Sequence, residues 1–478
     1  MEKKKRNTKH KRRNAFLDHF EKLAPDLAKY RKRYAYFWND IVRYCNYFIH
    51  EDDLVLEVGC ATGDMLARMH GKSKVGIDFS PKMIETAKSN YEEIDFYVED
   101  AEQITLDKKF DTIVLSHVTG YFVDVLKVFS SLRNVCHPGT RIIINYYNFL
   151  WEPLLLFGEL IGIKRKSPKQ NWLTKKDLQT FLYIAGYETY RSTKRVLIPI
   201  NIPIISWILN KFIGRLPLIN QLCLNNYIFA RPTMNLAKTE YSSSIVIPAR
   251  NESGNLENAL KRLPKFGSHQ EIIFIEGNST DDTWEQMQKL PEKYPDWDIK
   301  IDQQPGKGKG DAVRKGFSMA TGDILMILDA DLTVPPEDLP SFYYALIKNK
   351  GEFINGSRLV YPMEKNAMRL LNLIGNKFFS IMFSWLLDQP IKDTLCGTKV
   401  IFKKDYEKLI KNRAFFGEFD PFGDFDLIFG AYKLNLKIVD LPIRYRERIY
   451  GDTNISRFSH GFILLRMVGY AARKIKFY

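Results

Sequence analysis

Apolar runs alternate with helical patterns along most of the chain, and this alternation occurs twice. After a helical stretch to about residue 50, buried strands are predicted at "DLVLEVGC", "KVGIDFS", "DFYVEDAEQI", "FDTIVLSHV" and "RIIINYYNF". A second series begins at "SSIVIPARNE" and continues through "EIIFIEGNST", "DILMILDADL" and "FINGSRL". Strands that alternate with helices are typical of parallel sheets covered on both faces. We therefore expect an α/β protein with two doubly wound domains.

A polar stretch without periodicity, "MNLAKTEYSS", separates the two series. A chain of 478 residues is also too long for a single hydrophobic core. We predict five parts: a basic flexible tail over 1–15, a first domain over 16–233, a linker over 234–241, a second domain over 242–450, and a basic amphipathic segment over 451–478.

The net charge of +15 predicts an anionic partner, which could be nucleic acid, a phosphorylated substrate or a lipid surface. Part of this excess lies in "KKKRNTKHKRR", which indicates a solvated tail. No apolar region follows this run, so it is not read as a secretory signal. The five scattered cysteines favour a reducing cytosol.

Three segments combine apolar runs with Lys or Arg: 196–219, 368–387 and 462–478. The longest apolar run, 196–209, contains two prolines and is shorter than the roughly 20 residues that a span requires. Such segments favour reversible binding to an anionic membrane surface, although each also fits a core helix. We expect a cytoplasmic protein that associates peripherally with the cytoplasmic face of the membrane.

The first candidate site lies in the motif "EVGCATG". It places Glu57, Gly59 and Gly63 in the first βα turn, where missing side chains let the backbone approach a ligand. Asp78 ends the next strand, where a carboxylate can accept hydrogen bonds from both hydroxyls of a ribose. The glycine spacing differs from the G-x-G-x-x-G of dinucleotide-binding folds.

Four ordered motifs, "VLEVGCATG", "GIDFSPKMIETAK", "FYVEDAEQI" and "DTIVLSHV", resemble those of class I S-adenosylmethionine-dependent methyltransferases over residues 45–145. The resemblance implies that the backbone from Gly59 to Gly63 faces the amino-acid end of S-adenosylmethionine. It also implies that Asp78 binds the ribose and that Asp100 with Ala101 binds the adenine.

The methyl acceptor is not predicted by these motifs. His117 and Tyr121 are candidates for a catalytic base, and His117 equally fits a hydrogen-bonded loop histidine. A domain that binds the cofactor without turnover is a second possibility.

The second candidate site is the acidic pair in "GDILMILDADLTVPPEDL". Asp329 and Asp331 follow a buried strand, where two carboxylates repel each other unless a cation lies between them. A divalent metal is one interpretation, and a solvated turn is the other.

The motifs around this pair, "SIVIPARNESGNLENAL", "EIIFIEGNSTDDTWE" and "PGKGKGDAVRKGF", resemble family 2 glycosyltransferases of the GT-A fold over residues 242–450. The resemblance implies that Asp329 and Asp331 hold Mg²⁺ or Mn²⁺ against the diphosphate of a nucleotide sugar, with Asp331 as the more direct ligand. Glu276 stands where the family often has Asp, so recognition of the base or ribose is expected to differ. The implied donor-binding residues are Pro248, Asn251, Glu252, Glu276, Lys309, Arg314 and Asp329.

Three further motifs, "INGSRLV", "DTLCGTKV" and "LPIRYRERIYGDTNISRF", resemble the polyprenyl-phosphate (dolichyl-phosphate) branch of that family. Guanidinium groups bind phosphate oxygens in a forked geometry, which suits a donor or acceptor phosphate. A solvated basic face is the alternative. The arginines expected at phosphates are Arg358, Arg446, Arg448 and Arg457.

The nature of the acceptor decides whether a base is needed. A polyprenyl phosphate is largely ionised at neutral pH and needs none, whereas a glycan hydroxyl requires a carboxylate. "PFGDFDLIFG" offers Asp424 and Asp426 for that role. On a strand these two share a face, and on a helix they diverge by about 200°, so we favour Asp424 alone.

We expect a metal-dependent, inverting glycosyltransferase fused to a methyltransferase, both acting at a membrane. One alternative is a glycosyltransferase with a non-catalytic methyltransferase-like domain. Another is an RNA methyltransferase with a basic tail. No aromatic and basic RNA-binding motif supports the latter, so no nucleic-acid partner is expected.

Overall fold

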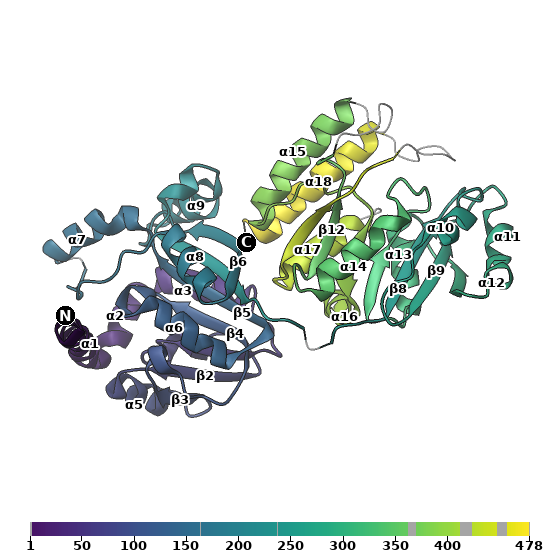
Figure 1. The fold of residues 1–478 in the computed structure, drawn as a ribbon. Helices are drawn as coiled ribbons and strands as arrows, with labels where there is room; N and C mark the ends of the chain where they lie inside the picture. Colours follow the sequence, from purple (N-terminus) through teal and green to yellow (C-terminus); the bar gives the residue numbers. More distant parts are fainter. Residues whose placement is uncertain are drawn as a thin grey trace. The chain divides into compact units, whose positions relative to one another are not determined.

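The computed structural model describes residues 2–162, 164–236, 238–361, 370–411, 423–446 and 457–477. These residues form two compact units that divide between Met234 and Asn235. Each unit contains one seven-stranded sheet with helices packed against it (Figure 1). The doubly wound α/β architecture predicted from the alternating pattern is confirmed.

The sheet of the first unit has the strand order β3-β2-β1-β4-β5-β7-β6. The first five of these strands are parallel, whereas β7 runs antiparallel to both β5 and β6. The strands are β1 (Leu54–Val58), β2 (Ser73–Asp78), β3 (Asp95–Val98), β4 (Phe110–Ser116), β5 (Cys136–Tyr147), β6 (Tyr187–Arg195) and β7 (Asn225–Pro232).

Helices connect these strands and cover the sheet. Leu56, Ile113 and Ile144 on neighbouring strands are fully buried and form one cluster with Phe129 and Leu132 of a covering helix. The helices are α1 (Glu2–Leu23), α2 (Leu27–Arg33), α3 (Ala35–Asn46), α4 (Asp64–Ala67), α5 (Pro81–Asn90), α6 (Val125–Leu132), α7 (Glu152–Leu160), α8 (Lys175–Ile184) and α9 (Ile205–Lys211).

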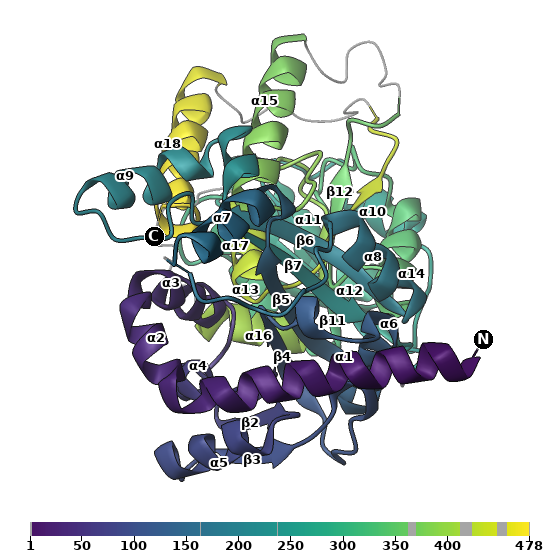
Figure 2. The same ribbon diagram turned by 90° about the vertical axis from the view of Figure 1, so that its left-hand side faces the viewer.

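The predicted flexible tail over 1–15 is wrong, because residues 2–15 belong to helix α1. Figure 2 shows α1 as one long helix beside the first sheet. Phe16 is buried, and Phe20 and Leu23 pack with Leu27 and Met83 in a small cluster. Phe16, Phe20 and Leu23 are spaced about one helical turn apart, so they form an apolar stripe that holds the helix against the unit. The basic run before this stripe contains no apolar residue.

The sheet of the second unit has the order β10-β9-β8-β11-β13-β12-β14. The first four strands are parallel, but β13 lies antiparallel between β11 and β12, so the sheet is mixed rather than wholly parallel. The strands are β8 (Ser243–Ala249), β9 (Gln270–Glu276), β10 (Asp298–Gln303), β11 (Ile324–Ile327), β12 (Phe353–Ser357), β13 (Lys399–Phe402) and β14 (Ile438–Pro442).

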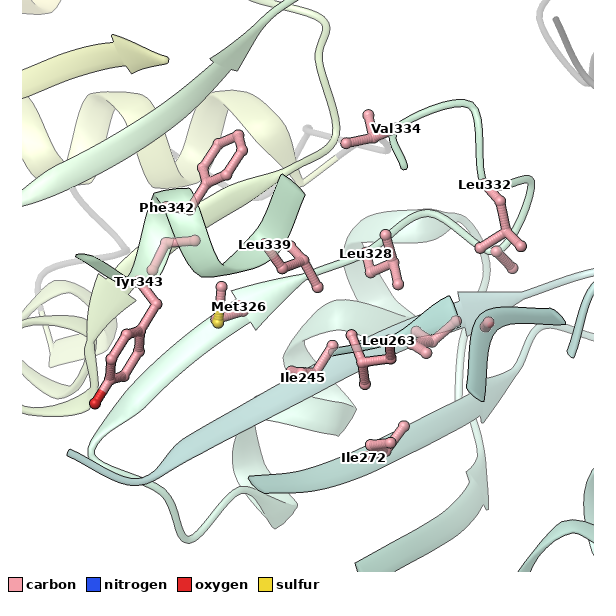
Figure 3. Close-up of a cluster of buried hydrophobic side chains, with 14 of the residues drawn as sticks. Ile245, Leu263, Ile272, Met326, Leu328, Leu332, Val334, Leu339, Phe342 and Tyr343 are labelled. Atoms are coloured by element: carbon pink, nitrogen blue, oxygen red, sulfur yellow. The ribbon is translucent and has the colours of Figure 1, made fainter. Parts of the chain in front are cut away.

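The core of this unit lies between the sheet and helix α14. Ile245, Ile272 and Met326 project from adjacent strands towards Leu339 and Phe342 of α14 (Figure 3). The helices are α10 (Leu256–Arg262), α11 (Thr283–Gln288), α12 (Leu290–Lys293), α13 (Lys309–Met319), α14 (Leu339–Ile347), α15 (Leu370–Leu387), α16 (Lys403–Lys411), α17 (Asp424–Lys433) and α18 (Arg457–Ile475).

A buried ion pair joins helix α3 to strand β6 in the first unit. Arg195, whose side chain is 2% exposed, donates two hydrogen bonds to Asp40 at 2.7 and 3.0 Å. Burial opposes ionisation of Asp40, but the neighbouring guanidinium groups outweigh it and lower the pKa of this carboxyl. The pair therefore stabilises the fold above about pH 4, and this contribution is lost as the pH falls further.

We predict that Asp40→Asn lowers the free energy of unfolding of the first unit by about 3 kcal/mol, because it leaves the Arg195 guanidinium buried without its counter-charge. Hydrogen-exchange mass spectrometry of α3 and β6 peptides in a urea series measures the change. The control Asp18→Asn removes an exposed pair with Lys22 and should change stability by less than about 0.5 kcal/mol. Equal effects of the two variants would contradict the prediction.

Candidate functional sites

The glycine turn of the first unit lies at the carboxyl end of β1 and is held by Asp78. Gly59 has a φ of 75°, and a Cβ at this position would lie 2.6 Å from Val118 Cγ2, so only glycine fits. Asp78 accepts hydrogen bonds from the backbone N–H groups of Ala61 and Ser80, each at 3.0 Å. The carboxylate thus fixes the turn and the start of α5 together.

Burial controls the ionisation of the two acidic residues near this turn. It raises the pKa of Asp78 to about 6, although backbone N–H groups oppose the shift. It raises the pKa of Glu57 to about 8, and among the described residues no partner is found for Glu57 Oε2. Glu57 therefore lies behind the turn in the interior of the unit.

A cavity of about 210 Å³ opens in front of this turn within the first unit. Of the predicted cofactor residues, Gly59, Asp78, Asp100 and Ala101 line it, whereas Glu57 and Gly63 do not. Much of the remaining lining comes from α1, from α2, from the loop after β4 and from residues 164–167.

Helix α1 covers part of the cavity. Arg13 forms an ion pair with Asp100 at 2.7 Å, and the rings of Phe16 and Phe20 contact Tyr121 edge-on at 5.6 and 5.1 Å between centroids. Arg13 was missed by the sequence analysis because residues 1–15 were read as a tail, and Phe16 and Phe20 were missed because the helical stretch that follows was given no part in the site. The spacing of Phe16, Phe20, Leu23 and Leu27 was the signal that could have revealed it.

His117 and Tyr121 both line the cavity. His117 Nε2 lies 2.9 Å from Asn145 Nδ2, and the ring packs against Tyr147 at 4.1 Å between centroids. Burial lowers the pKa of His117 to about 3 and raises that of Tyr121 to about 12. Both side chains are therefore neutral at pH 7.

The residues around the glycine turn, Gly59 and Asp78, fit S-adenosylmethionine. Each oxygen of Asp78 accepts one backbone hydrogen bond and keeps a second lone pair for a hydroxyl of a ribose. The turn after β1 offers backbone without side chains at Gly59, and the cavity adjoins both groups.

In the second unit, Ser279 links the ends of strands β8 and β9. Its hydroxyl accepts a hydrogen bond from Asn251 N at 3.0 Å, and its own N–H donates to Glu276 Oε1. Asn251, at a φ of 56°, also accepts from Thr280 N at 2.7 Å. Asn251 and Glu276 are thus brought together at one sheet edge, where Ala249 pairs with Glu276 and follows Pro248.

Glu252 is buried beside this edge. Its N–H donates to Thr283 Oγ1 at 2.9 Å, and its carboxylate accepts a hydrogen bond from Asn255 Nδ2 at 2.7 Å. These bonds hold the start of α10 against the start of α11, so Glu252 has a structural contribution of its own.

The acidic pair after β11 does have a cation beside it, and that cation is a lysine. Asp329 forms an ion pair with Lys309, the first residue of α13. Burial opposes the charge on both groups, but their mutual attraction outweighs it, which raises the pKa of Lys309 and lowers that of Asp329. Gly397 covers the pair so closely that any Cβ there would overlap both side chains.

A second buried pair lies next to the first. Lys399 Nζ donates to Asp424 Oδ1 at 2.8 Å, and the two side chains are 1% and 7% exposed. Lys399 also contributes to the lowered pKa of Asp329, and Asp424 to the raised pKa of Lys309. Four alternating charges, Lys309, Asp329, Lys399 and Asp424, therefore form one cluster, which we name the charge cluster.

Asp424 and Asp426 lie on helix α17, so they point in different directions. Asp424 reaches the charge cluster, whereas Asp426 lies 3.8 Å from Arg314. Arg314 also lies 3.6 Å from Asp311 on its own helix.

The predicted phosphate-binding arginines have different surroundings. Asp393 accepts hydrogen bonds from Arg358 Nε and a terminal nitrogen at 2.7 and 2.8 Å, so much of this guanidinium is already engaged. Arg446 N donates to Thr333 O at 3.0 Å, which places its backbone beside the acidic loop. Arg448 lies outside the described residues, and so does the side chain of Arg457, which begins α18.

The acidic pair fits a divalent cation of the magnesium type. Asp331 Oδ1 accepts hydrogen bonds from Thr333 N and Oγ1 at 3.1 and 2.8 Å, which fixes the orientation of this carboxylate. In the part of the chain that the structure describes, no group of three or more His, Cys, Asp or Glu could enclose a metal. Two carboxylates suit Mg²⁺, which takes its remaining ligands from phosphates and water.

Lys399, Asp393, Thr333 and Gly397 were not among the predicted site residues. Three of them lie in "DTLCGTKV", which was quoted only for its resemblance. A glycine and a lysine two residues apart next to an expected acidic site were the available signal.

Among the described residues, no helix has the length and apolarity to cross a bilayer.

Two family models match the chain, one in each of its two units. Residues 244–410 match the model for glycosyl transferase family 2, and residues 49–186 match a model for a methyltransferase domain. Among solved structures, the chain is similar to a methyltransferase complexed with the Trm112 activator from Haloferax volcanii, at 15% identity and a TM-score of 0.36, covering 45% of this chain and 97% of that one.

Curated relatives are similar to up to about half of the chain. A dolichol-phosphate mannosyltransferase of Pyrococcus furiosus is 30% identical over 244 residues, which is 49% of this chain and 66% of the relative. A UDP-N-acetylglucosamine–dolichyl-phosphate N-acetylglucosaminyltransferase of Methanococcus voltae is 25% identical over 217 residues, which is 42% of this chain and 86% of the relative. The chain thus joins a methyltransferase domain to a glycosyltransferase domain of family 2.

Proposed function

We propose that the second unit transfers a sugar from a nucleotide sugar to a polyprenyl phosphate, and that the first unit transfers a methyl group from S-adenosylmethionine. The observation that carries the first part is the charge cluster, of which Lys309, Asp329 and Lys399 lie within the region that matches glycosyl transferase family 2. Dolichyl-phosphate glycosyltransferases among the relatives of the chain support the proposed acceptor. The lysines of the cluster can pair with a diphosphate, and its carboxylates can hold a divalent cation against that diphosphate.

Each residue of the second site has a proposed role. Asn251 and Glu276 bind the nucleoside, and Lys309 with Arg314 holds the diphosphate of the donor. Asp329 and Asp331 hold Mg²⁺ or Mn²⁺, which would neutralise charge on the departing nucleoside diphosphate. Lys399 holds Asp424 in place through their ion pair.

The proposed acceptor phosphate fits the surroundings of Asp424. Phe383 of α15 stacks on Phe429 of α17 at 5.3 Å between centroids, so an apolar helix adjoins the helix that carries Asp424. The outer side of α15 exposes Phe378 and Ile381, the latter at 71%. We propose that a lipid chain follows this apolar surface while its phosphate reaches the charge cluster, with the enzyme bound peripherally to a membrane.

In the first unit, Asp78 binds the ribose and Asp100 with Ala101 binds the adenine. Burial destabilises the protonated form of His117, so this side chain is a weak base at pH 7. We therefore assign His117 to the wall of the acceptor site. The fused domains would then modify one lipid-linked product.

We predict that Asp331→Ala lowers sugar transfer by more than about 10²-fold and leaves methyl transfer unchanged, because this carboxylate acts only on the leaving diphosphate. Radiolabelled sugar transferred to polyprenyl phosphate measures the first activity. Asp338→Ala, in the same loop, is the control and should retain activity. Full sugar transfer in excess chelator would overturn the metal assignment.

We predict that the dissociation constant of S-adenosylmethionine rises as the pH falls through about 6, because protonated Asp78 loses an acceptor for the ribose hydroxyls. Calorimetry from about pH 8 to about pH 5 measures this dependence. Asp78→Asn should bind about tenfold more weakly at pH 8 and show a flat profile over the same range. An unchanged pH dependence in the variant would place the titrating group elsewhere.

We predict that Asp424→Asn and Asp426→Asn each lower kcat with polyprenyl phosphate by less than about 10²-fold, because an ionised phosphate needs no general base. Circular dichroism and donor binding check that the Asp424 variant, which loses a partner of buried Lys399, stays folded. A larger loss in a folded variant that still binds the donor would point to a hydroxyl acceptor.

A further inference from the structure

Helix α7 of the first unit has an apolar sequence but no buried residue. Four of its five large apolar side chains are exposed to solvent by half or more: Leu154 60%, Leu156 52%, Phe157 58% and Leu160 78%. Leaving so many apolar groups in water is unfavourable, and a contiguous exposed patch of this kind marks a binding surface.

A second exposed apolar segment lies next to α7. Trp151, just before α7, donates a hydrogen bond from Nε1 to Leu222 O at 2.7 Å, and Asn148 donates to Gln221 O and Cys223 O. These bonds join the start of α7 to the end of the segment 200–222. That segment exposes Ile200, Ile204, Ile205, Trp207, Leu216, Leu218 and Leu222 by 43% or more. We name the two together the apolar surface.

The chain that follows α7 is basic and lines the methyltransferase cavity. Residues 159–169 contain four basic side chains and one acidic one. Lys164, Arg165, Lys166 and Ser167 all line the cavity, with Lys164 tied to Glu159 and to Ser167 Oγ at 2.9 Å. Arg165 lies 3.8 Å from Asp26, and its side chain is 44% exposed. One short stretch thus runs from an exposed apolar helix to a basic rim of the cavity.

The sequence of an apolar helix followed by a basic segment matches the layers of an anionic membrane. Apolar side chains enter the acyl region, and the adjoining Lys and Arg groups meet the phosphates of the headgroups. A second copy of the chain is a poorer match, because each copy carries a net charge of +15 and like charges repel.

We infer that the methyl acceptor is an anionic lipid, taken from the bilayer on which the apolar surface rests and guided by the basic rim into the cavity. This inference rests on the proposed methyltransferase function. Tyr30, Tyr121 and Tyr147 line the cavity beyond the predicted cofactor residues and form the wall against which the acceptor lies.

The transfer itself balances without a further reactant. A nucleophilic oxygen of the headgroup forms a bond to the methyl carbon, and the bond between that carbon and the sulfonium sulfur breaks. The electron pair of this bond goes to sulfur and leaves S-adenosylhomocysteine. An ionised oxygen releases no proton, and a hydroxyl releases its proton to water.

The test uses the full chain, S-adenosylmethionine labelled in its methyl group, and vesicles of phosphatidylcholine with or without phosphatidylglycerol, each also containing polyprenyl phosphate. Flotation measures binding to vesicles, and extraction separates lipid-borne label from aqueous label. Nucleotide sugars are added in parallel, so that a lipid-linked sugar formed by the second unit is also offered as an acceptor.

Phe157→Asp should lower vesicle binding and lipid labelling at least tenfold, with unchanged affinity for S-adenosylmethionine by calorimetry. Arg165→Glu with Lys166→Glu should lower vesicle binding and lipid labelling mainly on the vesicles that contain phosphatidylglycerol, where the negative charge is highest. The matched controls are Ile184→Asp, exposed by 59% on α8 as Phe157 is by 58%, and Lys82→Glu with Lys88→Glu on α5. These controls should behave as the wild type.

Three results would overturn the inference. If Phe157→Asp leaves vesicle binding intact, the apolar surface does not bind the bilayer. If the wild type is a dimer that Phe157→Asp dissociates, the surface binds a second copy of the chain. Label that enters only aqueous molecules would exclude a lipid acceptor. A wild-type chain that does not bind S-adenosylmethionine would instead refute the proposed function itself.

Discussion

The second unit depends on pairing opposite charges with one another at the end of a buried strand. Asp329 follows β11, where an uncompensated carboxylate would be strongly disfavoured by burial. Lys309 and Lys399 supply the opposite charge, and Asp424 in turn balances Lys399. The residues that hold the cluster come from α13, the loop after β11, β13 and α17, so these elements have to meet for any one charge to be stable.

The same cluster explains several features of the chain that are otherwise unrelated. Gly397 is glycine because the Asp329–Lys309 pair fills the space of a side chain. Asp424 is buried at the start of a helix because Lys399 neutralises it there. Buried pairs of this kind give orientation more than net stability, because the loss of hydration offsets much of the attraction. An arrangement that is rigid and charged suits a site for a diphosphate, in which ligand charge replaces part of the internal pairing.

The first unit solves a different problem, because its cavity has to admit a cofactor and an acceptor while excluding bulk water. Asp78 fixes the glycine turn from below, and helix α1 covers the cavity from the side through Arg13, Phe16 and Phe20. Arg13, at the end of the basic N-terminal run, is therefore part of the site. Its neighbour Arg12 donates a hydrogen bond to Asn171 Oδ1 at 2.8 Å.

The sequence by itself determined the α/β class, the division into two families of motif, and the positions of Asp78 and Asp329 at strand ends, because these follow from hydrophobic periodicity and local turn chemistry. Only the tertiary structure decided what each charged group pairs with. Asp329 meets Lys309 20 residues earlier in the chain and Gly397 68 residues later, and periodicity carries no information about such contacts. The helical structure of the N-terminal segment also depends on tertiary contacts, because a helix with a narrow apolar stripe becomes stable when a partner surface buries that stripe.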